Sequence, residues 1–540
     1  MVKIKNFFSK FLFIFTLFIS KEFNFLYYNS SDSPDFPTYF NYFRYFFQEI
    51  ENTSREQGLF YYFLNSLNFY NFAELITEEN FFIYVHRSIQ QTNFYLYLFG
   101  VVGLYYLLKH FTFSQSSIFY TLSLLNVLPV TIAMRIVLKP EIIGFAMLPW
   151  IILCFEKFLV EKKFSYLYLA IPFTSLAISS KGSVLVMISS YIIIFYFRKI
   201  IIFKFTKVLL LSITFIIVIL GIYIEDSSAN EGNLINLQSG SVQGENYDFK
   251  APKNILYKVD IYKLFTSPKK YDHSSSMVGI TLLDTFGDYF DVYWDNDSSN
   301  YSLDRKVVFQ IEESKSIKAP NIDFVNKKIT LFDQKVPDLY LREFLGLILS
   351  IQFFIYVFLY AVKKNSYSKF IVAPFVGLSI LLVHIITGYP VNNFDPAKGD
   401  TLKTLYYSFF ILLSFVFLCV QILENKRFKA LRIMPIVLVM IFLLGFPKEN
   451  SVQSSINISN INEYSYFCNF NNTVILERQE NEILSKCEKE LLTPVQGFFS
   501  YAEYTNYKTA PKFPIFNILV AISTIVSSLV LLNMSYKKTY

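Results

Sequence analysis

Long apolar segments recur along the whole chain, and each is long enough to form a helix that crosses a lipid bilayer. A bilayer core about 30 Å thick needs roughly 20 helical residues, and segments of about 16 can cross with local thinning. Hydrophobic residues make up 53% of the 540 residues and charged residues only 17%, a balance that does not suit a chain surrounded by water alone. The sequence therefore predicts an all-α, polytopic membrane protein with about twelve transmembrane helices. The expected spans are 7–27, 92–108, 114–133, 142–159, 164–179, 182–197, 208–224, 341–362, 370–388, 404–424, 432–446 and 513–534.

Basic residues mark one side of this topology. If the N-terminus lies inside, the inner connections are short and basic, as at Lys162-Lys163 and Lys426-Arg427, which is the pattern of the positive-inside rule. Both termini are then cytoplasmic, and we expect the membrane to be the bacterial inner membrane, with the endoplasmic reticulum as the alternative. The net charge of +7 is dispersed over these connections, so it does not indicate a nucleic-acid partner. The long outer segments are 28–91, 225–340 and 447–511.

The first apolar segment resembles a signal peptide but lacks its cleavage site. Lys21-Glu22-Phe23 stands where small residues would be needed, so we expect an uncleaved first helix. In the outer segment that follows, the aromatic stretch 39–47 suits helices that lie in the membrane interface.

The cysteines differ in their predicted surroundings. Cys154 and Cys419 fall inside expected spans, where buried thiols are inert. Cys468 and Cys487 share the last outer segment, and an oxidising exterior predicts a disulfide between them, with two free thiols as the alternative.

Familiar nucleotide and hydrolase motifs do not occur in the sequence. It contains no GxxxxGK[ST], HExxH or GxSxG, so neither a P-loop ATPase nor these hydrolase classes are indicated. Any chemistry has to come from carboxylates and cations at the outer face of the membrane.

Two acids follow the first apolar segment. Asp32 and Asp35 lie a few residues beyond it, at the depth where a membrane-bound substrate would present its headgroup, which suits a general base. The alternative is that both residues only cap a following helix, because Asp before a Pro-containing first turn is a common helix start.

Charged residues also occupy two very short outer connections. The first contains Arg135, Lys139 and Glu141, and the next contains Lys181. Charge so close to lipid is costly, which favours a functional role such as a phosphate-binding rim. Snorkelling side chains that anchor helix ends are the alternative.

Two more outer segments are compatible with this rim. Asp288 lies among aromatic residues in 283–294, as in sugar-binding sites, although a turn of a folded loop domain would look similar. Lys398 and Lys403 precede the span expected at 404–424 and are candidates to hold an anion there, with an ordinary interfacial lysine pair as the alternative.

The arrangement of these residues resembles the multispanning glycosyltransferases of the GT-C fold, which use polyprenyl- or dolichyl-phosphate-linked sugars. The likeness rests on Asp32 and Asp35, on 56–62 in the long first outer segment, on Lys139-Pro140-Glu141 and on Ser180-Lys181-Gly182. It covers about residues 1–224, with a weaker likeness at 398–407.

The resemblance implies an inverting sugar transfer to a glycan, lipid or protein acceptor. Asp35, or else Asp32, would be the base, Glu141 the acid of the first short outer connection, and Lys181 a contact of the lipid phosphate. Metal-dependent relatives carry an acid-x-acid pair in that connection. Glu141 has no acidic partner at 139 or 143, so the use of a divalent metal stays open.

The resemblance also divides the chain. Residues 1–224 would form the GT-C-like catalytic transmembrane module and 225–340 a large extracytoplasmic loop domain. A second transmembrane module at 341–446, a small cap at 447–511 and a last helix with an inner tail at 512–540 would follow.

Two other functions remain open at this point. A polysaccharide polymerase or ligase has a similar number of helices, but it would be expected to use arginines of the large outer loop, where only Arg305 lies well inside 225–340. A flippase or transporter for lipid-linked sugars would carry charged or broken helices near the membrane midplane, whereas the expected spans are nearly uncharged at their centres.

Overall fold

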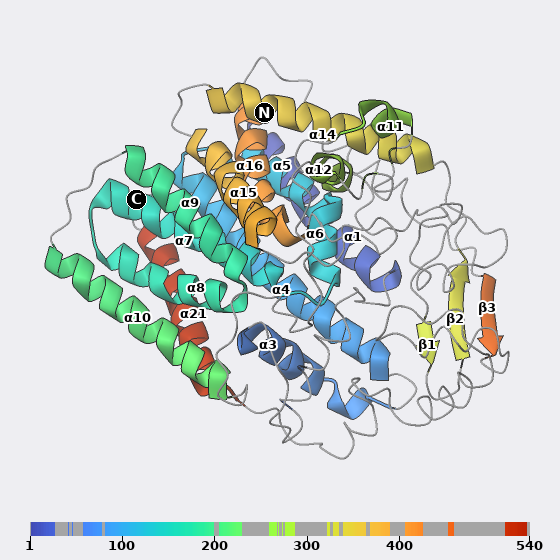
Figure 1. Cartoon of the computed structure of the whole chain (residues 1–540), viewed down its shortest axis with the longest axis horizontal. Helices are drawn as coiled ribbons and strands as arrows, with labels where there is room; N and C mark the ends of the chain where they lie inside the picture. The colour runs from blue at the N-terminus through green and yellow to red at the C-terminus, as the bar shows by residue number, and fades with distance from the viewer. Residues whose placement is uncertain are drawn as a thin grey trace.

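Helices form most of the described part of the computed structural model (Figure 1). Each expected span within the described residues is occupied by a helix, and the span expected at 432–446 lies outside them. The described residues are 2–27, 42, 46, 58–77, 81–198, 205–228, 259–266, 268, 273, 276–286, 321–323, 328–333, 339–362, 368–388, 405–424, 452–457 and 513–536.

The long helices follow the apolar segments, because a helix satisfies its own backbone hydrogen bonds and leaves only apolar side chains facing outward. They are α1 (Val2–Tyr27), α4 (Phe81–His110), α7 (Glu141–Glu161), α8 (Ser165–Ser180), α9 (Gly182–Arg198), α10 (Phe205–Ser228), α14 (Leu339–Val362), α15 (Ser368–Gly388), α16 (Leu405–Glu424) and α21 (Ile515–Tyr536).

Four of the described helices are long and apolar enough to cross a membrane, or five if one bent pair counts as a single span. The four are the segments Glu141–Glu161, Thr206–Asp226, Phe344–Val362 and Ile515–Met534. This supports an integral membrane protein, while the expected number of about twelve spans stays a prediction.

The bent pair consists of α5 (Gln115–Val127) and α6 (Pro129–Ile136), which meet at an angle of 63°. Leu128 between them has an extended backbone, and Pro129 begins α6, where its missing N–H costs no hydrogen bond. The sequence predicted a single span at 114–133. The break arises because residues before proline avoid the helical conformation.

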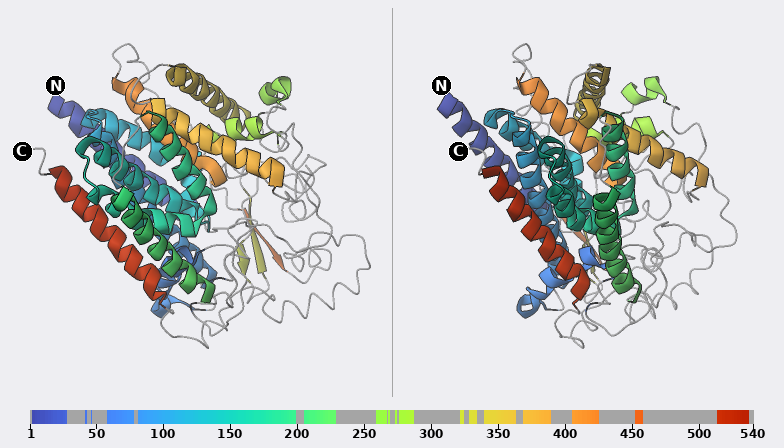
Figure 2. Two further views of the ribbon diagram at one scale, coloured as in Figure 1. Left: turned by 60° about the vertical axis from the view of Figure 1, so that its left-hand side comes forward. Right: turned by 90° about the vertical axis from the view of Figure 1, so that its left-hand side faces the viewer.

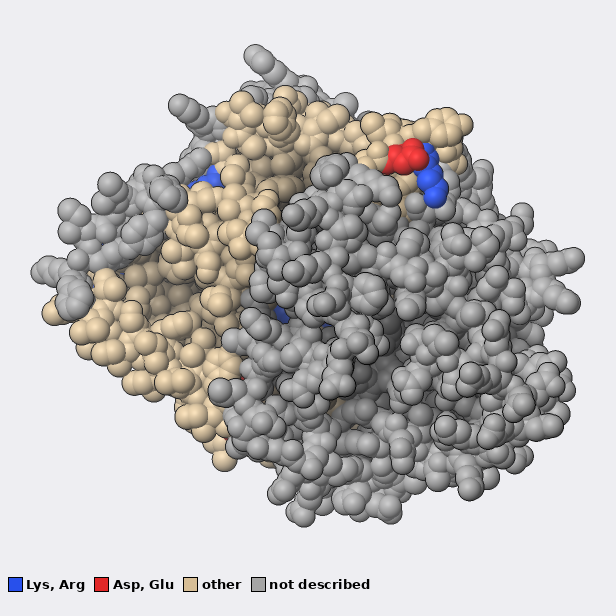
Figure 3. All heavy atoms as spheres, viewed as in Figure 1, with Lys and Arg blue, Asp and Glu red and all other residues tan. Residues whose placement is uncertain are grey.

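Helices differ sharply in their burial. In the most apolar 18-residue stretch of α7, 89% of the residues are buried, whereas in that of α10 only 6% are buried. The helix α7 therefore lies inside the bundle and α10 at its edge (Figure 1). Exposed apolar side chains also line α1 and α21, for example Phe11 and Leu529. The described surface in Figure 3 carries few charges. Such large exposed apolar surfaces are expected where lipid covers a protein.

Polar contacts join corresponding ends of the helices. At one end, Glu156 of α7 contacts Lys369 of α15 at 2.5 Å, and Ser114, just before α5, donates its hydroxyl to Glu424 of α16 at 2.6 Å. At the opposite end, Arg135 of α6 donates to Ser20 of α1. The start of α1 and the end of α21 lie at the same end of the bundle (Figure 2).

Shorter helices belong to the outer segments expected from the sequence. The helix α3 (Leu59–Tyr70) and the short 3-10 helix η1 (Ala73–Leu75) lie in the first of these segments, and α11 (Ile261–Thr266) and α12 (Met277–Phe286) lie in the second. The first outer segment thus contains a helix, but α3 is largely buried against α4 and α8 rather than exposed.

A small antiparallel sheet adds strands to the helical fold. Its order is β1 (Asn321–Asp323), β2 (Lys328–Asp333) and β3 (Val452–Asn457). Thr330 of β2 pairs with Asn321 of β1 on one side and with Ser455 of β3 on the other. Segments 225–340 and 447–511, which the sequence assigned to separate outer regions, therefore contribute to one sheet.

Candidate functional site

An ion pair between Glu141 and Lys181 joins the two short connections that the sequence singled out. Lys181 Nζ lies 3.1 Å from Glu141 Oε1, and the exposed fractions of the two side chains are 17% and 1%. Glu141 is the first residue of α7, where the amides of the helix start favour a negative charge. Lys181 has an extended backbone between α8 and α9, so its side chain leaves the helix direction and reaches Glu141.

The Glu141 carboxylate is almost completely buried, and no described residue donates a hydrogen bond to its Oε2. A buried carboxylate is costly unless an opposite charge accompanies it. Lys181 supplies that charge, and its own side chain is partly exposed. The arrangement therefore combines a buried acid with a partly exposed cation.

Lys139 lies two residues before Glu141 and is also buried, with 2% exposure. Its backbone N–H donates to the Tyr61 hydroxyl at 3.1 Å, and that hydroxyl donates to Asn93 Oδ1 at 2.8 Å. Burial raises the pKa of Tyr61, which keeps the hydroxyl protonated and able to donate. Tyr61 of α3 thereby fixes the connection that carries Lys139 and Glu141.

Arg135 is fully buried and points into the helix bundle. Its guanidinium donates to the backbone oxygens of Thr131 and Asn126 and to the Ser20 hydroxyl, and it lies 4.6 Å from the centre of the Tyr97 ring. Its charge is thus directed at carbonyl oxygens of the bent helix pair. Arg135 therefore links α1 to the bent pair α5 and α6, and its role in substrate binding stays a prediction.

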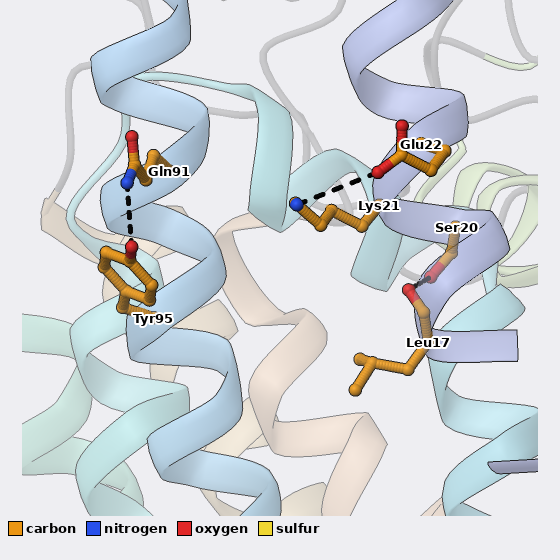
Figure 4. Close-up of polar contacts among 6 residues, drawn as sticks. All are labelled: Leu17, Ser20, Lys21, Glu22, Gln91 and Tyr95. Atoms are coloured by element: carbon orange, nitrogen blue, oxygen red, sulfur yellow. Dashed lines mark hydrogen bonds and ion pairs between the residues drawn. The ribbon is translucent and has the colours of Figure 1, made fainter. Parts of the chain in front are cut away.

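The residue Ser20 lies in the C-terminal half of α1. Its hydroxyl donates to Leu17 O at 3.1 Å, and the neighbouring Lys21 and Glu22 form an ion pair at 3.7 Å (Figure 4). Ser20 also accepts from Arg135 at 2.9 Å. The end of α1 is therefore connected to α6, immediately before the connection that carries Lys139.

Sequence reasoning missed an acidic pair at the end of α10. Glu225 accepts hydrogen bonds from the backbone of Phe516 and Asn517 at 2.9 and 2.7 Å. Asp226 accepts from the Asn517 side chain at 3.0 Å and from Leu59 N at 3.4 Å. The only signal in the sequence was two adjacent acids directly after the apolar segment 208–224.

Several candidate residues of the sequence lie outside the described residues. They are Asp32, Asp35, Asp288, Lys398, Lys403, Cys468 and Cys487, and their roles stay predictions. Cys154 and Cys419 are described and are buried free cysteines, as the sequence indicated. Within the described ranges, no group of three or more His, Cys, Asp or Glu side chains forms a possible metal site.

Comparison with protein-family models finds no match, and searches of curated proteins and of solved structures also find none. The fold itself defines a mostly helical protein with several apolar helices able to cross a membrane. Among its charged groups, the pair formed by Glu141 and Lys181 joins two connections that the sequence had selected independently.

Proposed function

We propose that the chain is a membrane glycosyltransferase that moves a sugar from a polyprenyl-phosphate-linked donor to an acceptor at the extracytoplasmic face. The contact between Lys181 and Glu141 carries the proposal. A phosphate headgroup needs a cation at the membrane surface, and Lys181 offers one that is held by a fixed carboxylate yet remains partly exposed.

The topology in this proposal is that of the bacterial inner membrane, with about twelve spans and both termini in the cytoplasm. Support comes from the pairing of helix ends. The contacts of Glu156 with Lys369 and of Ser114 with Glu424 join segments assigned to the inner side. The contacts of Lys181 with Glu141 and of Asn517 with Glu225 join segments assigned to the outer side.

The proposed reaction is a single displacement with inversion. The acceptor hydroxyl oxygen bonds to the anomeric carbon, the bond from that carbon to the phosphate oxygen breaks, and the hydroxyl proton passes to a carboxylate. Asp35 is the proposed base, with Asp32 as the alternative. Lys181 and Lys139 stabilise the negative charge on the departing lipid phosphate, which is the main electrostatic requirement of such a transfer.

The test combines Asp35→Asn with Asp32→Asn as its matched control, in purified protein supplied with polyprenyl-phosphate sugars. Asp35→Asn should fold and bind the lipid but lose about 2 to 4 orders of magnitude in the transfer rate, because the amide cannot accept the proton. Lys181→Ala should instead weaken binding of the lipid phosphate, since its charge also acts on the bound donor.

Loss of transfer in Asp32→Asn, with Asp35→Asn unaffected, would move the base to Asp32. Normal transfer in both folded variants would refute the mechanism.

A further inference from the structure

The helix α3 contacts both of the short connections whose charged residues, Lys181 and Glu141, form the ion pair. On one side, Gly58 N, just before α3, donates to Ser179 O at 3.1 Å, two residues before Lys181. On the other side, the Tyr61 hydroxyl accepts from Lys139 N, two residues before Glu141. The first turn of α3 therefore contacts both chain segments that carry the paired charges.

Asp226 holds this first turn from the side of α10. Its Oδ1 accepts from Leu59 N at 3.4 Å, and the residue is 1% exposed. A carboxylate in the last turn of a helix is opposed by the helix dipole. The amide at the start of α3 and the Asn517 side chain at the start of α21 offset that cost, so Asp226 stabilises both helix starts.

Space at this point is too small for any side chain on residue 58. A Cβ on Gly58 would lie 2.6 Å from Ser179 O and 3.1 Å from Asp226 Oδ2. The backbone of Gly58 therefore lies close to both α8 and α10.

We infer that Asp226 is a positioning residue for the ion pair of Lys181 and Glu141, acting through the first turn of α3. The expected effect on sugar transfer rests on the proposed function, whereas the expected effect on the position of α3 does not. Asp226 acts at the start of α3 and takes no part in the transfer itself. Its carboxylate sets where α3 begins, and α3 sets the spacing of the two connections.

The adjacent Glu225 provides a matched control. Its carboxylate contacts Phe516 and Asn517 at the start of α21, so Glu225→Ala disturbs α21 as Asp226→Ala does. In the hydrogen bonds resolved for this acidic pair, only Asp226 reaches Leu59. Asp226→Asn is the conservative variant, because its side-chain oxygen can still accept from Leu59 N.

The structural arm uses Ser66→Cys as a reporter in α3, since Ser66 is fully buried and the change is small. We expect Asp226→Ala to accelerate labelling of this cysteine by a water-soluble maleimide about 10-fold through local opening of α3. Glu225→Ala should leave the rate within about 2-fold, and Asp226→Asn should restore most of the protection. The protein without Ser66→Cys gives the background from native cysteines.

The catalytic arm measures sugar transfer in the same variants. Asp226→Ala should lower kcat about 10- to 100-fold with a much smaller change in KM, because misplaced groups fail in the transition state. Glu225→Ala should change kcat less than about 3-fold. Equal labelling in both alanine variants would overturn the inference, as would a normal kcat in Asp226→Ala. If the wild-type chain transfers no sugar, the proposed function fails, and the labelling arm still decides whether Asp226 anchors α3.

Discussion

Removing either member of the ion pair between Glu141 and Lys181 should destabilise the protein by unequal amounts. Lys181→Met keeps an apolar stem of similar length but leaves the Glu141 carboxylate, only 1% exposed, without its counter-charge. Breaking a buried pair in this way costs about 3 to 5 kcal/mol. Glu141→Gln leaves a lysine that is 17% exposed and can extend toward water, so we expect a cost of about 1 to 2 kcal/mol.

The double variant Glu141→Gln/Lys181→Met should be more stable than Lys181→Met alone, because no isolated charge remains buried. We expect the double variant to cost about 2 to 4 kcal/mol. The two single changes together would cost about 4 to 7 kcal/mol, so the coupling free energy is about 2 to 3 kcal/mol. Unfolding by sodium dodecyl sulfate in mixed micelles, followed by fluorescence, would measure it. Trp150 of α7 is 1% exposed and reports on the helix that begins at Glu141.

A surface ion pair of the same chain serves as the control. Lys21 and Glu22 lie 3.7 Å apart, with exposed fractions of 49% and 36%, so Lys21→Met should cost less than about 1 kcal/mol. Two results would refute the reasoning. One is a cost for Lys181→Met no larger than that for Lys21→Met, and the other is strict additivity in the double variant.

Two further predictions concern the outer segments. A cysteine introduced at Gly240 should react with an impermeant thiol reagent added from outside, and one at Ile200 should not. The basic connections predict that these positions lie on opposite sides of the membrane, so the reverse pattern would require a new topology. Cys468 and Cys487 should form a disulfide that stabilises the protein by about 3 kcal/mol on the chain-entropy model. Finding both cysteines as free thiols, by mass spectrometry of unreduced peptides from native membranes, would contradict this prediction.

The sequence predicted the helices well because their signal is local. Each apolar run is a continuous stretch, so hydrophobicity alone locates helices such as α7 and α10 to within a few residues. The bend between α5 and α6 was missed because a proline can either begin a new helix or be accommodated inside one. Pro149 and Pro172 lie within α7 and α8 without ending them.

The candidate site was predicted in part. Glu141 and Lys181 were selected because each lies in a very short connection on the same predicted side of the membrane, and the structure brings them to 3.1 Å. Asp226 was missed because its partner Leu59 is 167 residues away in the chain. A local sequence pattern does not indicate which helix will have its first turn next to a given carboxylate.

What the sequence determined by itself is the order of the apolar helices along the chain, because burial in lipid imposes a length and a composition on every span. Tertiary structure alone decided that Arg135 turns inward to Ser20 and Asn126 while Lys181 remains partly exposed. Both are cations beside apolar segments. Their surroundings differ because helices that are distant in the chain pack together. This packing decides whether each cation contacts carbonyl oxygens or a carboxylate.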